Sequence, residues 1–133
     1  MATQVQSYPL PPKKTAITVA YDVQNFLNHS ENMQTQIFET GERGAIVQAR
    51  VKGGKAKQWI GMDKAITVKL SEQNALLTIE IGESKWVDKG IAMTVSMFVL
   101  WPLAITSAVG MAKQAKLPEK IFRCIRMSLG YPA

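Results

Sequence analysis

The sequence predicts an α+β fold: a strand, a short helix and an antiparallel β-meander, followed by an apolar helix or helical hairpin and a C-terminal amphipathic helix. Three observations lead to this prediction. Apolar and polar residues alternate through the middle of the chain, which is typical of a sheet with one covered and one solvated face. Residues 91–112 contain no charged side chain. Near the C-terminus, Leu117, Ile121 and Ile125 recur at every fourth position, as on one face of a helix.

The chain of 133 residues is long enough for one modest core, so a single domain with tails is the expected organisation. Prolines at positions 9, 11 and 12 remove amide donors and favour an extended chain, which predicts an N-terminal tail. The predicted units are a Pro-rich tail at 1–14, a small α+β domain at 15–87, an apolar helix or hairpin at 88–114, and a C-terminal amphipathic helix and tail at 115–133.

The predicted domain begins with a strand at 15–20, because this stretch is rich in β-branched residues that alternate with smaller ones. Asp22 is expected to be the N-cap of the short helix that follows. Glycines between the later apolar runs permit tight turns, so these runs are expected to be strands of a meander. The remaining strands are predicted at 34–39, 44–52, 58–70 and around 77–81.

The uncharged run 91–112 is the most informative segment. As a helix its 22 residues would be about 33 Å long, enough for the hydrocarbon core of a bilayer. Pro102 lies near its centre and both flanks are basic, which favours a hairpin bent at Trp101 and Pro102 with both ends in the cytoplasm. Burial in the protein's own fold or against a second copy is the alternative. The residues expected at a membrane or protein interface are Trp86, Met93, Met97, Phe98, Trp101 and Pro102.

Sixteen Lys and Arg against ten Asp and Glu leave a net charge of +6, which favours anionic partners. The basic residues are concentrated after the apolar run and around a Gly-Gly turn. The C-terminal helix has one basic side, so it could lie on anionic lipid or pack on its own sheet. The candidates for contact with an anionic surface are Lys113, Lys116, Lys120, Arg123 and Arg126, with Arg50, Lys52, Lys55 and Lys57.

No motif in the chain indicates catalysis, a cofactor or a metal. A single histidine, His29, and a single cysteine, Cys124, are too few ligands for a zinc site. Cys124 lies in an apolar run, where a buried structural thiol is the ordinary interpretation. No glycine-rich phosphate loop has the required spacing, and no aromatic platform for nucleic acid is evident. The sequence therefore predicts neither an enzyme nor a nucleic-acid-binding protein.

The leading hypothesis is a membrane-associated, non-catalytic binding or scaffold protein that is anchored by the apolar segment, with its main domain in the cytoplasm. The first residues have no signal-peptide pattern, which supports that orientation. The layout also resembles small helix-on-sheet ligand-binding folds. This resemblance implies the first alternative, a soluble cytoplasmic domain that binds a small apolar ligand. The second alternative is an obligate homo-oligomer that uses the apolar segment as its interface. The expected partners are thus membrane lipid or a protein.

Overall fold

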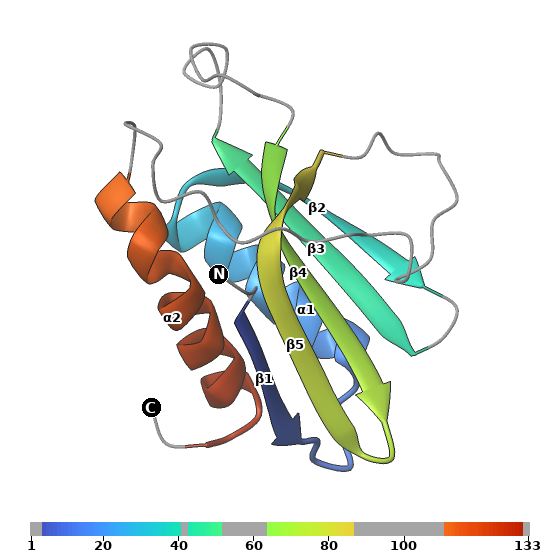
Figure 1. Ribbon diagram of the computed structural model, residues 1–133. Coiled ribbons are helices and arrows are strands. Elements are labelled where there is room, and N and C mark those ends of the chain that lie inside the picture. Colours follow the sequence, from blue (N-terminus) through green and yellow to red (C-terminus); the bar gives the residue numbers. More distant parts are fainter. Residues whose placement is uncertain (1–3, 41–42, 52–63, 87–110, 132–133) are drawn as a thin grey trace.

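The computed structural model describes residues 4–40, 43–51, 64–86 and 111–131. Five antiparallel strands form one sheet in the order β1-β5-β4-β3-β2, and two α-helices accompany it (Figure 1). The predicted α+β class is confirmed. In chain order the elements are β1 (Gln4–Pro9), α1 (Ala16–Asn25), the π-helical turn η1 (Phe26–Ser30), β2 (Met33–Thr40), β3 (Gly44–Val51), β4 (Lys64–Gln73), β5 (Leu76–Lys85) and α2 (Met111–Ser128).

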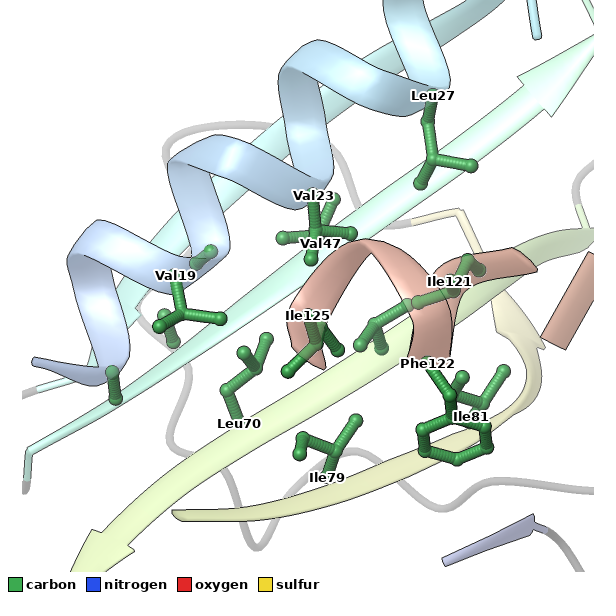
Figure 2. Packing of buried hydrophobic residues seen from close by; sticks show 14 of the residues in the cluster. Val19, Val23, Leu27, Val47, Leu70, Ile79, Ile81, Ile121, Phe122 and Ile125 are labelled. Carbon is green, nitrogen blue, oxygen red and sulfur yellow. The ribbon is translucent and has the colours of Figure 1, made fainter. Parts of the chain in front are cut away.

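Both helices contribute to a core on one face of the sheet. Strand alternation directs Val47, Val68 and Ile79 to that face, where they join side chains of α1 and α2 in one buried cluster. Figure 2 shows Val19 of α1 and Phe122 of α2 converging on this cluster from the two helices. Burying a side chain of this size stabilises the fold by about 1.5–3 kcal/mol, so the cluster is the main source of stability.

The predicted strand at 15–20 is wrong, because these residues begin α1. Thr15 is the N-cap, and it exchanges reciprocal hydrogen bonds with Thr18 in a capping box. The buried residues Ala16, Val19, Ala20 and Val23 follow helical spacing. Burial of this apolar face outweighs the strand preference of the β-branched residues.

Asp22 is therefore not an N-cap, since it lies inside α1. Its carboxylate accepts a hydrogen bond from the Ser128 hydroxyl of α2 and forms an ion pair with Lys14 at 3.7 Å. The side chain thus links α1 to α2 and to the preceding loop.

Part of the predicted N-terminal tail is also a strand. β1 pairs with β5, with Gln6 opposite Ile79, and so becomes an edge strand of the sheet. Pro9 ends the strand, a position where its missing amide hydrogen costs no ladder bond. The chain then contributes Leu10 to the core, and the Leu10 amide donates to the Ala75 carbonyl at 2.7 Å.

The predicted meander is present with shifted boundaries. The strands predicted at 34–39 and 44–52 are confirmed as β2 and, up to Val51, as β3, but residue 52 and residues 58–63 lie outside the described residues. β4 continues to Gln73 instead of turning at Ser71, because the turn is made by Asn74 and Ala75. Both have positive φ, 53° and 61°, as a two-residue hairpin turn of mirror-image type requires.

α2 begins at Met111, four residues before the predicted C-terminal unit 115–133. The residues before Pro118 are mainly good helix formers, which allows the helix to continue through the proline. The predicted apolar stripe is confirmed: Leu117, Ile121, Phe122, Ile125 and Leu129 are all buried. The helix packs on its own sheet, and Gly130, with φ of 88°, follows its last turn.

The direction of α2 follows from contacts at its two halves. Lys120 forms an ion pair with Glu31 at 3.5 Å, just before β2, whose first residue Met33 lies opposite Val51. Beyond the other end of α2, the Tyr131 hydroxyl donates to the Pro9 carbonyl at 2.8 Å, at the end of β1. α2 therefore starts near the sheet end formed by Met33, Val51, Lys64 and Lys85, called here the Lys85 end (Figure 1).

Candidate functional site

The structure brings together two residues that the sequence singles out separately, Arg50 and Trp86. The guanidinium carbon of Arg50 lies 4.0 Å from the centroid of the Trp86 ring. This distance is within the range of a cation–π interaction. Arg50 is near the end of β3 and Trp86 directly follows β5, so the pair bridges across the intervening β4 at the Lys85 end.

Arg50 lies on the sheet face opposite the helices, because it alternates with the core residue Ala49. Its Nε donates to Oε1 of Gln34, the residue opposite it on β2, at 3.1 Å. Among the carboxylates of the described segments, none makes an ion pair with Arg50 within 4.0 Å. Within the described segments, the partners of the guanidinium are therefore a ring and an amide.

A buried polar row lies beside this pair on the same face. Nε2 of Gln36 donates to Oε1 of Gln48 at 2.9 Å, which links β2 to β3. Nε2 of Gln48 donates to the hydroxyl oxygens of Thr67 and Ser84 at 3.2 and 3.1 Å, which extends the row to β4 and β5. Each of the four side chains is at most 5% exposed. Their mutual hydrogen bonds offset the cost of burying polar groups.

Sequence reasoning did not identify this row. Strand alternation places Gln36, Gln48 and Thr67 on the face that does not pack against the helices, and such a face is ordinarily wet. The only local signal is an amide flanked by apolar residues in the stretch from Ile46 to Ala49. That signal does not reveal the burial.

The basic residues of α2 have a different setting from Arg50. Lys120 is paired with Glu31, and Nη1 of Arg126 donates to the Tyr8 hydroxyl at 3.2 Å. Arg123 is exposed. α2 packs on the helix-bearing face, whereas Arg50 lies on the other face. Lys113 and Lys116 belong to the first turns of α2 by backbone position.

The other residues predicted to contact an interface or an anionic surface lie outside the described residues. They are Lys52, Lys55, Lys57, Met93, Met97, Phe98, Trp101 and Pro102.

Cys124 is a partly buried thiol at the junction of the two helices. Its Sγ lies 3.8 Å from the backbone carbonyl oxygen of Asp22. Burial, with a smaller contribution from the Asp22 charge, raises the pKa of Cys124 from 9.0 to about 11. A reactive thiol requires the opposite shift, since the thiolate is the nucleophile. His29 is exposed on η1.

An open groove lies at the start of α1. It has a volume of about 440 Å³, and its walls include Thr15, Arg43 and Glu72. Oε1 of Glu72 accepts a hydrogen bond from the Ala16 amide at 3.4 Å, so a carboxylate of the chain itself already complements the positive end of the helix dipole.

The described elements define a small α+β domain with both helices packed on one face of an antiparallel sheet. No helix within these elements is long and apolar enough to cross a bilayer. In the same part of the chain, no group of three His, Cys, Asp or Glu is arranged to hold a metal ion. The chain matches no family model, no curated protein and no solved structure.

Proposed function

We propose that this chain is a membrane-associated, non-catalytic binding or scaffold protein whose α+β domain is held at a bilayer by the uncharged segment 91–112. One observation is the main support: the described chain on either side of this segment lies toward the same end of the domain. β5 reaches that end at Lys85, and α2, whose first residues Met111 and Ala112 are also the last of the segment, begins near it (Figure 1).

Shared packing of β5 and α2 favours a hairpin over a single span. Ile79 and Ile81 of β5 belong to the same buried cluster as Phe122 and Ile125 of α2. A single crossing would put the two elements on opposite sides of the membrane and expose these side chains, whose burial contributes about 1.5–3 kcal/mol each. A hairpin with its bend at Pro102 returns the chain to the side it left, and so preserves the core.

The anchor would be shallow. With the bend at Pro102, each arm of the segment would be about 16 Å long as a helix, roughly half of the hydrocarbon thickness. Such arms enter one leaflet and return, which agrees with basic residues on both flanks, Lys85 and Lys89 before the segment and Lys113 and Lys116 after it. The domain would then lie on the cytoplasmic side.

The ligand-binding alternative requires a cavity between the sheet and its helices. Val19, Leu70 and Phe122 are buried side chains of the cluster between these layers (Figure 2). This packing gives the cavity hypothesis no specific support. The oligomer hypothesis depends on 91–112 alone, so the same experiment separates it from the membrane proposal.

The test is fractionation of the expressed full-length chain, followed by alkaline carbonate extraction. We expect the protein to stay with the membrane pellet, and reporters fused before residue 1 and after residue 133 to lie on the same, cytoplasmic side. Quantitative recovery as a soluble monomer would overturn the anchor, and a soluble oligomer would favour the interface hypothesis. Reporters on opposite sides would contradict the hairpin.

A charge placed in the segment provides a matched pair of variants. Leu100→Arg adds a cation beside the expected bend, at a cost of about 2.5–3.5 kcal/mol if that position lies deep in lipid. Met127→Arg adds the same charge to α2 at a side chain that is 59% exposed. We expect only Leu100→Arg to shift protein into the soluble fraction. An equal shift in both variants would indicate a nonspecific effect of charge.

A further inference from the structure

We infer that Arg50 and Trp86 form a recognition site for the phosphate group of anionic lipids, in which no headgroup cation offsets the phosphate charge as choline does in phosphatidylcholine. The inference rests on the proposed function, because it takes the bilayer surface to lie at the Lys85 end. It adds a specific contact to that proposal. The anchor requires only an apolar segment, whereas this site would give the protein a preference among membranes.

The geometry of the pair suits a phosphate. The guanidinium lies over the ring of Trp86 at 4.0 Å, and Gln34 accepts from Nε at 3.1 Å. Stacking uses the flat face of the guanidinium and leaves its edge to donate hydrogen bonds. Among the described residues, the guanidinium donates its hydrogen bond through Nε, so its two terminal nitrogens can supply a bidentate contact with phosphate oxygens.

Arg50 is also held in place before any ligand binds. Its backbone belongs to β3 and pairs with Gln34 of β2, and the pairing of β3 with β4 reaches the preceding residue, Ala49. Two residues earlier on the same face, Gln48 joins the buried polar row. Ordering a long side chain on binding costs about 0.5–1.5 kcal/mol of conformational free energy. Arg50 is already partly ordered in the folded domain, so its remaining cost on binding is smaller.

The position of the pair identifies a lipid as the occupant. Only residues 87–90 separate Trp86 from the first residue of the uncharged segment, and tryptophan is enriched at the headgroup level of membranes. By backbone position, Lys64 lies opposite Lys85 in the strand register, and Lys113 and Lys116 lie in the first turns of α2 near the same end. These cations favour an anionic surface.

A nucleic acid fits these observations less well. Single-stranded nucleic acid is bound along a track of cations with several stacking aromatics. The site here is one arginine over one tryptophan, at the point where the chain approaches its longest uncharged run. Binding of a nucleic acid is therefore an outcome that the test must be able to detect.

The test is flotation of the full-length protein with vesicles of phosphatidylcholine, alone or mixed with phosphatidylglycerol. We expect the wild-type chain to prefer the anionic vesicles and R50Q to lose about fivefold of that preference, which corresponds to about 1 kcal/mol per cation near a membrane surface. R50K keeps the charge but not the planar fork, so we expect its preference to be weaker than that of the wild-type chain and stronger than that of R50Q.

Arg43→Gln is the matched control. It removes the same charge from an exposed arginine at the other end of β3, about 23 Å away at the strand rise of about 3.3 Å per residue. This separation exceeds the screening length of about 8 Å at physiological salt. We expect R43Q to bind both vesicle types like the wild-type chain. Thermal melts of all three variants verify the fold, and R50K serves as the test if R50Q does not fold.

The outcomes separate this inference from the proposed function. If the wild-type chain floats with neither vesicle type, the membrane proposal itself fails. If R50Q, R50K and R43Q all retain the wild-type preference, or lose it equally, the Arg50–Trp86 site is overturned while the anchor stands. Competition by inorganic phosphate at matched ionic strength would indicate a site for free anions, and would also overturn the lipid assignment. The lipid assignment would also be overturned if the protein bound an RNA oligonucleotide and R50Q abolished that binding.

Discussion

The Ser128 hydroxyl in the last turn of α2 donates a hydrogen bond to the Asp22 carboxylate in the middle of α1. The same carboxylate faces Lys14 at 3.7 Å, and the Asp22 carbonyl faces Cys124. One acidic residue thus joins the two helices through a hydrogen bond between residues that are 106 positions apart in sequence. The contact helps to hold α2 against the domain after the chain has passed through 91–112.

Ser128→Ala should lower the free energy of unfolding by about 1 kcal/mol, because it removes a hydrogen bond to a charged group that is only partly shielded from water. Urea denaturation would measure the change. Ser30→Ala, at an exposed serine of η1, is the control and should stay within about 0.5 kcal/mol of the wild-type chain. Equal effects of the two substitutions would mean that the bond to Asp22 contributes nothing.

Gln48→Leu should destabilise the domain by about 1–3 kcal/mol, even though leucine is apolar and similar in size. The substitution removes the hub of the polar row and leaves Gln36, Thr67 and Ser84 each short of a buried partner. Gln73→Leu makes the same change at an exposed strand position and should be nearly neutral. A Gln48→Leu variant as stable as the wild-type chain would show that the row is unimportant for stability.

Cys124 should react slowly with a thiol reagent in the folded protein. At pH 8 the thiolate fraction with a pKa of about 11 is about 100-fold lower than with the ordinary value of 9.0, so alkylation should slow by about that factor relative to urea-unfolded protein. Timed alkylation followed by mass spectrometry measures both rates. Comparable rates in the two states would contradict the burial of the thiol.

The same shift predicts how stability depends on pH. The folded state holds the Cys124 proton more tightly than the unfolded state, so the contribution of this group is constant below pH 9 and is lost as the pH rises from 9.0 toward about 11. Chemical denaturation of the wild-type chain and of Cys124→Ser across this range isolates the effect. The serine variant should lose less stability over that interval, and parallel curves would refute the linkage.

Phe122→Ala should cost about 3–5 kcal/mol, because it opens a cavity where α2 meets Ile81 (Figure 2). Met127→Ala truncates a side chain on the same helix that is 59% exposed, and should change stability by less than about 0.5 kcal/mol. Denaturation curves followed by circular dichroism compare the two. If both substitutions lower the free energy of unfolding only slightly, packing of α2 against the sheet does not contribute to stability.

The β2 to β5 meander was predictable because apolar and polar residues alternate in parts of it, most clearly at Ile66, Val68 and Leu70. The stripe on α2 was predictable for the same reason, since Leu117, Ile121 and Ile125 recur at helical spacing. In both cases the period of the pattern agrees with the element that forms.

The errors came from local preferences that tertiary contacts override. The stretch Thr15 to Ala20 is β-branched, yet its burial on the sheet and the capping box of Thr15 make it a helix. β1 has no clear alternation, and it exists because β5 supplies a partner strand about seventy residues later. No window of a single sequence contains that pairing.

The candidate site was half predictable. Arg50 and Trp86 each stood out as a cation and an aromatic beside basic or apolar runs. Their contact depends on two strands that flank β4, and hence on the register of three strands together. The polar row centred on Gln48 has the same dependence on register.

The placement of α2 sets an order of events during synthesis. The sheet can pair β1 with β5 once residue 85 is available, but Phe122 and Ile125 complete the core only after 91–112 has left the ribosome. At about 5–20 residues per second, the apolar run is exposed for seconds beside an unfinished domain. Engagement of the apolar run by a bilayer would thus precede closure of the core, so the domain would complete its folding already at the membrane.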